Sequence, residues 1–237
     1  MVQKGDFGQA QKVLQQALSE TKDPEQQATL RFRLRCTQQQ EQFHNGEWVD
    51  LLAGEDLVEW TSAAGQWKPT APGEIEGIAA PDGLLATFRV PFSLPLEITG
   101  QVEFVHTPYA LSNAAVLVCP VPRLAKATVF PGNSIIIFRS EKKVFADFDN
   151  HDIEPNTPLE GAIEAPVKKT TDFDILLWPE QVSVKINDKW ITEKKPIDVQ
   201  WGFKSDVGIG IGGRYWYAEP KLRFRNLKVR RLAVETP

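Results

Sequence analysis

The clearest structural signal in this chain is Val182-Ser-Val-Lys-Ile186, a segment of its last third. Its valines and isoleucine alternate with serine and lysine, a pattern typical of an antiparallel strand with one buried and one solvent-facing side. Asn187-Asp188 follows directly and favours a tight hairpin turn. The sequence therefore predicts a half-buried antiparallel sheet here.

Three neighbouring segments predict further strands, at 173–178, 207–211 and 222–229. In the last of these, the alternation of apolar residues changes parity at Asn226, and a one-residue slip of this kind predicts a β-bulge. The glycines at 208, 210, 212 and 213 permit a bend and a close approach of backbones.

Short β-rich runs also occupy the middle of the chain, with turn-forming residues between them. They are 84–90, 96–98, 101–105, 114–119, 134–138 and 143–148. One of the expected turns is Thr99-Gly100. Together with the C-terminal segments this gives roughly ten strands, more than a single flat sheet holds, so two packed sheets are expected.

Three C-terminal phrases carry a family resemblance: Val182-x-Val-x-Ile186-Asn187, Gly208-Ile-Gly210 and Phe224-Arg-Asn-Leu-x-Val229. They resemble the closing strands of concanavalin A-like lectin/glucanase sandwiches. Within that superfamily, residues 55–234 are most similar to laminin-G-like domains and to the bacterial 3-keto-disaccharide hydrolase-like domain. The resemblance implies a mainly β fold, a two-sheet antiparallel jelly-roll sandwich over 55–237. These motifs are structural, and no catalytic residue is carried over with them.

The first 50 residues follow a different pattern and predict an α-helical hairpin before the sandwich. Apolar residues recur at helical spacing, Asp23-Pro24-Glu25 is typical of a helix start, and Asn45-Gly46 is typical of a helix end. Gly5-Asp-Phe-x-x-Ala10 resembles a helix start of tetratricopeptide-type repeats, and Gly46-Glu-Trp-x-x-Leu51 echoes it. Two interpretations stay open: the end of a helical-repeat array, or a hairpin packed on the sandwich.

Composition narrows the function classes. The chain has 237 residues, 42% hydrophobic content and a net charge of −4, which gives no reason to expect a nucleic-acid partner. No apolar run is long enough for a membrane span, and Met1-Val-Gln-Lys lacks the apolar core of a signal peptide. Cys36 and Cys119 are interpreted as two thiols rather than a disulfide. The compartment stays open, as does whether the chain is a fragment of a larger protein.

An aromatic cluster after the glycine-rich segment is the best candidate for ligand binding. The residues concerned are Arg214, Tyr215, Trp216, Tyr217 and Glu219. Flat rings can stack on the C–H faces of sugars, while the charged side chains fix the orientation of the ligand. The alternative is that one or two of the rings close an end of the core. The remaining tryptophans, at 60, 67, 178, 190 and 201, are expected to be core or loop anchors.

An acidic segment provides a candidate metal site. Asp147, Asp149 and Asp152 supply hard oxygen ligands near a strand end, which suits calcium, and His151 is the best titratable candidate. The spacing does not match an EF-hand. The alternative is a solvated, self-repelling acidic loop.

Evidence for catalysis is weak. The Glu-x-Asp-x-x-Glu strand of the glucanase branch is absent, and the nearest acid pairs are Glu74-Ile-Glu76 and Asp172-Phe-Asp174. A basic stripe follows the last strand: Lys221, Arg223, Arg225, Lys228, Arg230 and Arg231. It is interpreted as a solvated strand face, with an acidic partner as the alternative.

The sequence therefore favours a non-catalytic module that binds carbohydrate or a protein partner through rim loops of a β-sandwich. Whether it is an enzyme stays open. One alternative is a glycoside-processing hydrolase of the 3-keto-disaccharide hydrolase-like type, and another is a structural scaffold or docking domain. Calcium is the only cofactor considered, and neither nucleic acid nor a membrane span is expected.

Overall fold

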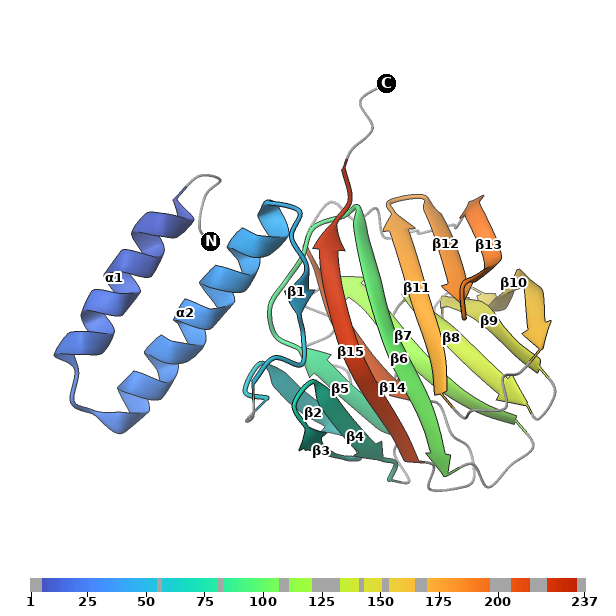
Figure 1. The fold of residues 1–237 in the computed structure, drawn as a ribbon, viewed down its shortest axis with the longest axis horizontal. Coiled ribbons are helices and arrows are strands. Elements are labelled where there is room, and N and C mark those ends of the chain that lie inside the picture. The colour runs from blue at the N-terminus through green and yellow to red at the C-terminus, as the bar shows by residue number, and fades with distance from the viewer. Residues whose placement is uncertain are drawn as a thin grey trace.

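Two helices precede two antiparallel sheets in the computed structural model of the chain (Figure 1). The structure describes residues 6–54, 57–80, 83–106, 111–120, 133–140, 143–150, 154–164, 170–196, 206–213 and 221–233. The expected mainly β sandwich with helices at its N-terminal side is confirmed.

The helices are α1 (Phe7–Glu20) and α2 (Pro24–His44), and local chemistry sets their ends. The Asp23 carboxylate accepts a hydrogen bond from the backbone nitrogen of Glu25 at 3.0 Å, so it caps the start of α2 as expected. Gly46 has a φ of +77° and ends the helix, in the left-handed conformation that glycine adopts without strain. No helix among the described residues is both long and apolar enough to cross a membrane.

An eight-stranded sheet holds the order β13-β12-β11-β6-β15-β4-β3, and β1 pairs with β15 outside this path. Its strands are β1 (Val49–Asp50), β3 (Gln66–Ala71), β4 (Glu74–Ile78), β6 (Leu96–His106), β11 (Thr170–Trp178), β12 (Gln181–Ile186), β13 (Lys189–Pro196) and β15 (Lys221–Arg231).

A seven-stranded sheet has the order β10-β9-β8-β7-β14-β5-β2. Its strands are β2 (Trp60–Ala64), β5 (Leu84–Phe88), β7 (Leu111–Pro120), β8 (Asn133–Ser140), β9 (Lys143–Asn150), β10 (Glu154–Glu164) and β14 (Val207–Gly213). The chain changes sheet repeatedly, for example between β5 and β6, β6 and β7, β13 and β14, and β14 and β15. In contrast, β7 to β10 follow one another within one sheet and β11 to β13 within the other.

The C-terminal strands have the geometry that their pattern predicts. Asn187 and Asp188 have φ values of 47° and 63°, the positive pair of a type I′ hairpin turn between β12 and β13. In β15, Arg225 lies opposite Gln101 and Lys228 opposite Thr99, so three steps along β15 match two along β6. The predicted bulge is thus confirmed.

The expected turn at Thr99-Gly100 is wrong, because β6 runs without a break through both residues. Gly100 lies opposite Phe173 of β11 and turns toward the core. A Cβ atom at this position would come 2.8 Å from Phe173 Cζ and 3.1 Å from Leu227 Cδ1. Glycine is therefore present to make room for two core side chains rather than to reverse the chain.

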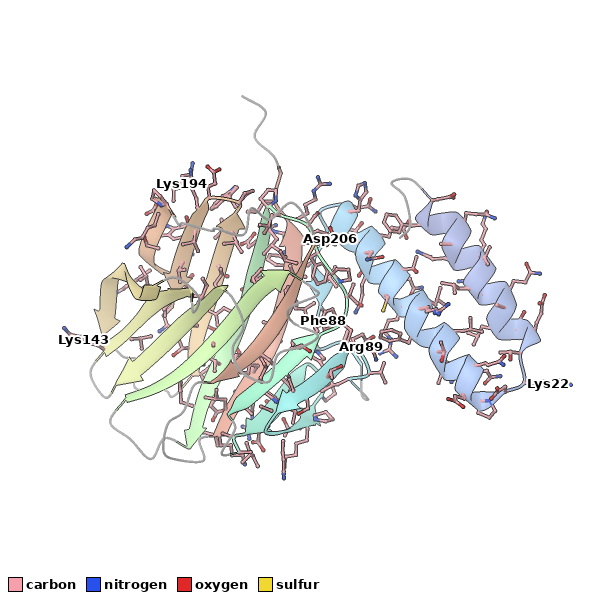
Figure 2. The ribbon with its side chains drawn as sticks, turned by 180° about the vertical axis from the view of Figure 1, so that it is seen from behind. Lys22, Phe88, Arg89, Lys143, Lys194 and Asp206 are labelled. Carbon is pink, nitrogen blue, oxygen red and sulfur yellow. The ribbon has the colours of Figure 1, made fainter. Side chains whose placement is uncertain are left out.

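The helical hairpin contacts the sandwich through α2. Phe43 is buried and its ring centroid lies 4.8 Å from that of Phe92. The guanidinium of Arg89 lies 4.4 Å above the ring of Phe32, on the side of the sandwich that faces α2 (Figure 2). No residue of α1 is buried, and α1 packs against α2 as the outermost element (Figure 1).

A buried charge and a thiol share this interface. Arg35 Nε of α2 lies 3.0 Å from Glu59 Oε1, whose side chain is almost fully buried. Burial, followed by the negative charge of Glu59, raises the pKa of the Cys36 thiol to about 11. Cys36 is a free thiol, and the side chain of Cys119 lies outside what the structure describes, so the two-thiol interpretation stays a prediction. The Cys36 thiol is neutral at physiological pH and packs as a small apolar group.

The second tetratricopeptide-like phrase does not begin a helix. Val49 and Asp50 form β1 and pair with Val229 and Lys228 of β15. Val49 is fully buried, so pairing with the sheet overrides the local helical resemblance. The repeat-like character of the hairpin itself stays a prediction.

Candidate functional site

The predicted ligand and metal residues lie largely outside the described ranges. Arg214, Tyr215, Trp216, Tyr217 and Glu219 belong to the undescribed segment between β14 and β15, and Asp152 follows β9. Asp147 and Asp149 lie in β9, opposite Ile136 and Ser134 of β8. Only the backbone of these two aspartates is described, so the calcium site stays a prediction.

Strand direction and register relate the starting points of these two predicted sites. β14 pairs antiparallel with β7, β7 with β8, and β8 with β9. β9 therefore runs opposite to β14. The chain therefore leaves β14 after Gly213 and β9 after Asn150 in opposite directions, while the register through β7 and β8 places Asp147 level with Gly212.

Glu74 and Glu76 are one of the two acid pairs that come nearest to the glucanase motif. Cationic side chains contact both of them on the outer face of the eight-stranded sheet. Arg223 Nη2 donates to Glu76 Oε2 at 2.8 Å, and Lys221 Nζ lies 3.0 Å from Glu76 Oε1. Arg225 Nε donates to Glu74. Each carboxylate is thus engaged in charge-assisted hydrogen bonds.

These contacts set the protonation of both glutamates. Burial alone would raise the pKa of Glu76, but hydrogen bonds from Lys221 and Arg223 and their positive charges together bring it below the ordinary value. For Glu74, burial is likewise outweighed by hydrogen bonds from Thr70 and Arg225, so its pKa is also lowered. Neither group carries a proton at neutral pH, which excludes this pair as a general acid.

The same contacts account for much of the basic stripe. Besides its bond to Glu76, Arg223 donates to Glu103 Oε2 at 3.0 Å, and Arg230 Nη2 lies 2.6 Å from Glu97 Oε2. Acidic side chains on β4 and β6 therefore balance Lys221, Arg223, Arg225 and Arg230. The face of β15 that was predicted to be solvated therefore carries basic side chains that form ion pairs with acidic side chains of the neighbouring strands.

The second acid pair lies farther along the same face. Asp172 Oδ1 accepts a hydrogen bond from Gln101 Nε2 at 2.7 Å. Asp174 lies opposite Lys185 of β12, and Lys185 lies opposite Trp190 of β13. We call Asp174, Lys185 and Trp190 the Trp190 row. The row places an acid, a base and an aromatic ring side by side on three adjacent strands.

Trp190 contradicts the expectation that it anchors the core or a loop. It lies in β13 and is 45% exposed, whereas its neighbour Ile191 is buried on the core side. Lys185 Nζ lies 6.0 Å from the ring centroid of Trp190, and it also lies 3.2 Å from Asp188 Oδ1. In contrast, Trp60 and Trp67 pack against the core as expected. An exposed aromatic ring beside charged groups is a candidate binding feature that the sequence analysis did not consider.

The reason for this omission is that β13 was not expected as a strand. Its sequence, Lys-Trp-Ile-Thr-Glu-Lys-Lys-Pro, contains a single buried apolar residue, Ile191. The available signal was Asn187-Asp188, because a hairpin turn after β12 requires a returning strand. Alternation from Ile191 would then have placed Trp190 on the outer face.

The chain matches no protein-family model and none of the curated proteins. Among solved structures, one of the endo-acting O-glycanases of human gut microbiota has a TM-score of 0.56 at 10% identity, covering 78% of this chain and 98% of that chain. The laminarinase from Flavobacterium sp. UMI-01 has a TM-score of 0.53 at 10% identity, covering 77% and 98%. The κ-carrageenase from Pseudoalteromonas carrageenovora has a TM-score of 0.50 at 9% identity, covering 77% and 94%.

These similarities concern the fold. They confirm the two-sheet β-sandwich fold, and the assignment to the concanavalin A-like lectin/glucanase superfamily stays a prediction. The laminin-G-like and 3-keto-disaccharide hydrolase-like assignments stay predictions, since sandwiches of one architecture host many functions.

Proposed function

We propose that this protein is a non-catalytic carbohydrate-recognition module and that the Trp190 row is a contact site for its ligand. The observation that carries the proposal is the exposed ring of Trp190, with Asp174 and Lys185 beside it on the same sheet face. Proteins of similar fold include a laminarinase and a κ-carrageenase bound to an oligotetrasaccharide of κ-carrageenan, which supports carbohydrate as the ligand class.

The chemistry of the row suits a sugar. A pyranose ring offers an apolar C–H face, which stacks on an indole, and a rim of hydroxyl groups that need hydrogen-bond partners. The carboxylate of Asp174 accepts hydrogen bonds and the ammonium of Lys185 donates them. Adjacent strands are about 4.8 Å apart, so the three side chains span one or two sugar rings.

Recognition is favoured over hydrolysis by the state of the nearest acid pair. Retaining and inverting glycosidases both need one carboxyl group that carries a proton. Glu74 and Glu76 are held ionised by Arg223, Arg225 and Lys221. Within the described part of the chain, this pair therefore gives no support to a hydrolase of the 3-keto-disaccharide hydrolase-like type.

The aromatic segment 214–219 is a second proposed contact, reached from the end of β14. Calcium at Asp147, Asp149 and Asp152 is proposed as an accessory ion near the end of β9. A protein partner is the competing ligand class, and the experiment below separates the two.

Binding to a glycan array, with laminarin, κ-carrageenan and mucin O-glycans as named probes, tests the proposal. We expect Trp190→Ala to weaken binding about tenfold or more, which corresponds to losing one stacked ring. Trp190→Phe keeps an aromatic face and should retain most of the affinity. Because the side chain is exposed, both variants should unfold at the urea concentration that unfolds the original protein.

Other outcomes have definite meanings. Loss of binding in Trp216→Ala, with Trp190→Ala unchanged, would place the site in the segment 214–219. Loss of binding on calcium chelation would support the Asp147–Asp152 ion site. Folded protein that binds no glycan would overturn the proposal in favour of protein docking, and release of sugars from laminarin would establish a hydrolase.

A further inference from the structure

A pocket of about 640 Å³ lies where the end of α2 meets the end of β15. Its described lining residues are His44, Asn45, Gly46, Arg230, Arg231, Leu232 and Ala233. Three of these side chains are basic and none is acidic. We call this site the junction pocket, and it does not include any residue of the Trp190 row.

Backbone hydrogen bonds build both walls of the junction pocket. At the end of α2, the nitrogens of Gly46 and Glu47 donate to the carbonyl groups of Phe43 and Gln42 at 3.0 and 2.9 Å. These bonds satisfy carbonyl groups that would otherwise repel an anion at a helix C-terminus. On the other wall, the nitrogen of Leu232 donates to the carbonyl of Pro95 at 3.1 Å and fixes the end of β15.

Arg230 is a fixed part of the pocket rather than a free charge. Its Nε donates to Glu97 Oε2 at 2.7 Å, and its guanidinium lies 4.4 Å above the ring of Trp48. Glu97 balances the charge of Arg230, and the stacked indole holds its side chain in place.

Arg231 and His44 provide the remaining basic groups. Within the described ranges, no ion pair joins either residue to an acidic side chain. The ring of His44 lies 5.9 Å from that of Phe7, which restricts its orientation. The junction pocket thus presents an arginine fork, an imidazole and the amide of Asn45 without a matching carboxylate in its lining.

We propose that the junction pocket binds an oxyanion group, such as the carboxylate of a uronic acid or the phosphate of a sugar phosphate, carried on a small polar molecule. Arg231 binds the anion through two parallel N–H donors, a geometry that suits planar carboxylates and phosphates. His44 and Asn45 supply further donors. The volume lies within the range of small-molecule sites, so the pocket holds more than an isolated ion.

This proposal stands apart from carbohydrate recognition at the Trp190 row, since it uses different residues. Isothermal titration calorimetry with three probes of similar size tests it: glucuronic acid, glucose 6-phosphate and uncharged glucose. We expect at least one anionic probe to bind about tenfold or more tightly than glucose. Tighter binding of glucuronic acid would indicate a carboxylate ligand, and tighter binding of glucose 6-phosphate would indicate a phosphate ligand.

Matched variants locate the binding. Arg231→Gln should weaken binding of the anionic probe about tenfold or more. Arg231→Lys should have an affinity between those of the original protein and Arg231→Gln, because it keeps the positive charge but loses the two parallel N–H donors. Lys189→Gln removes an exposed positive charge elsewhere and should leave the affinity for the anionic probe unchanged. Equal binding of glucose and both anions, or unaltered binding in folded Arg231→Gln, would overturn the proposal.

Discussion

Arg223 shows how one side chain organises a charged sheet face. Its guanidinium lies 2.8 Å from Glu76, 3.0 Å from Glu103 and 3.2 Å from Glu74. Three carboxylates this close would repel one another without a central cation. The hydrogen bond to Glu76 is the main reason that the pKa of Arg223 is raised, so this guanidinium is charged at neutral pH.

Glu76→Gln should reduce the acid sensitivity of folding. Because the folded-state pKa of Glu76 lies below its ordinary value of 4.5, its ionised form stabilises the fold above that pH, and this contribution is lost as the pH falls through the lowered pKa. The variant should be less stable near neutral pH, by about 2 kcal/mol for lost charged hydrogen bonds. Its stability should also decline less steeply below about pH 4.5.

Urea unfolding midpoints across that pH range provide the measurement. Glu193→Gln, which changes an exposed carboxylate on β13, is the matched control and should follow the original protein at every pH. A pH profile of Glu76→Gln parallel to that of the original protein would contradict the assigned role of Glu76.

Among the strands, predictability follows burial. β12 and β15 could be predicted because apolar and polar residues alternate in them, and the hairpin turn and the bulge followed from Asn187 and Asn226. β13 could not be predicted from pattern, since an edge strand with one buried side chain carries little apolar signal. The Trp190 row could not be predicted either, because it requires β13 and the pairing of β13 with β12. The ion pairs of Glu74 and Glu76 depend on pairing between β4 and β15, residues far apart in sequence.

Two glycines in different elements should respond oppositely to alanine. Gly100→Ala in β6 would place a methyl group 2.8 Å from Cζ of Phe173 in β11. Such overpacking costs about 1–3 kcal/mol of stability. Gly8→Ala in α1 meets no atom within 4 Å and gains helix propensity, so it should stabilise by about 0.5 kcal/mol. Urea denaturation of both variants measures the signs, and a neutral Gly100→Ala would show that the core at Phe173 relaxes freely.

Taken as one body, the protein is a sandwich with a helical arm attached along α2. α2 contributes Phe43 to the core cluster, whereas no residue of α1 is buried. The contacts that hold the arm come from α2 and include Phe43 with Phe92, Arg35 with Glu59, and Phe32 with Arg89. Thr37 and Gln39 of α2 are also buried. Helices held by few buried contacts open locally before the rest of a fold.

Phe43→Ala should loosen the arm more than the sandwich. Loss of this buried ring costs about 3 kcal/mol. Amide hydrogen exchange followed by mass spectrometry should speed up in α1 and α2, while β11 keeps its protection. Val13→Ala, a change at an exposed position of α1, is the control and should not speed up exchange in the helices or in β11. An equal increase in β11 would mean that helices and sheets unfold as a single cooperative unit.

The position of β13 at the end of its sheet has a consequence for solubility. An outermost strand offers unpaired backbone groups to any other chain, and a tryptophan beside them would ordinarily invite polymerisation. Here Lys189 and Lys194 add charge to that strand, and Pro196 lacks a backbone donor at its end. Lys194, labelled in Figure 2, has a φ of 47°, which departs from extended strand geometry. These features of β13, the edge strand that carries the exposed Trp190, thus disfavour the addition of further strands and the growth of fibrils.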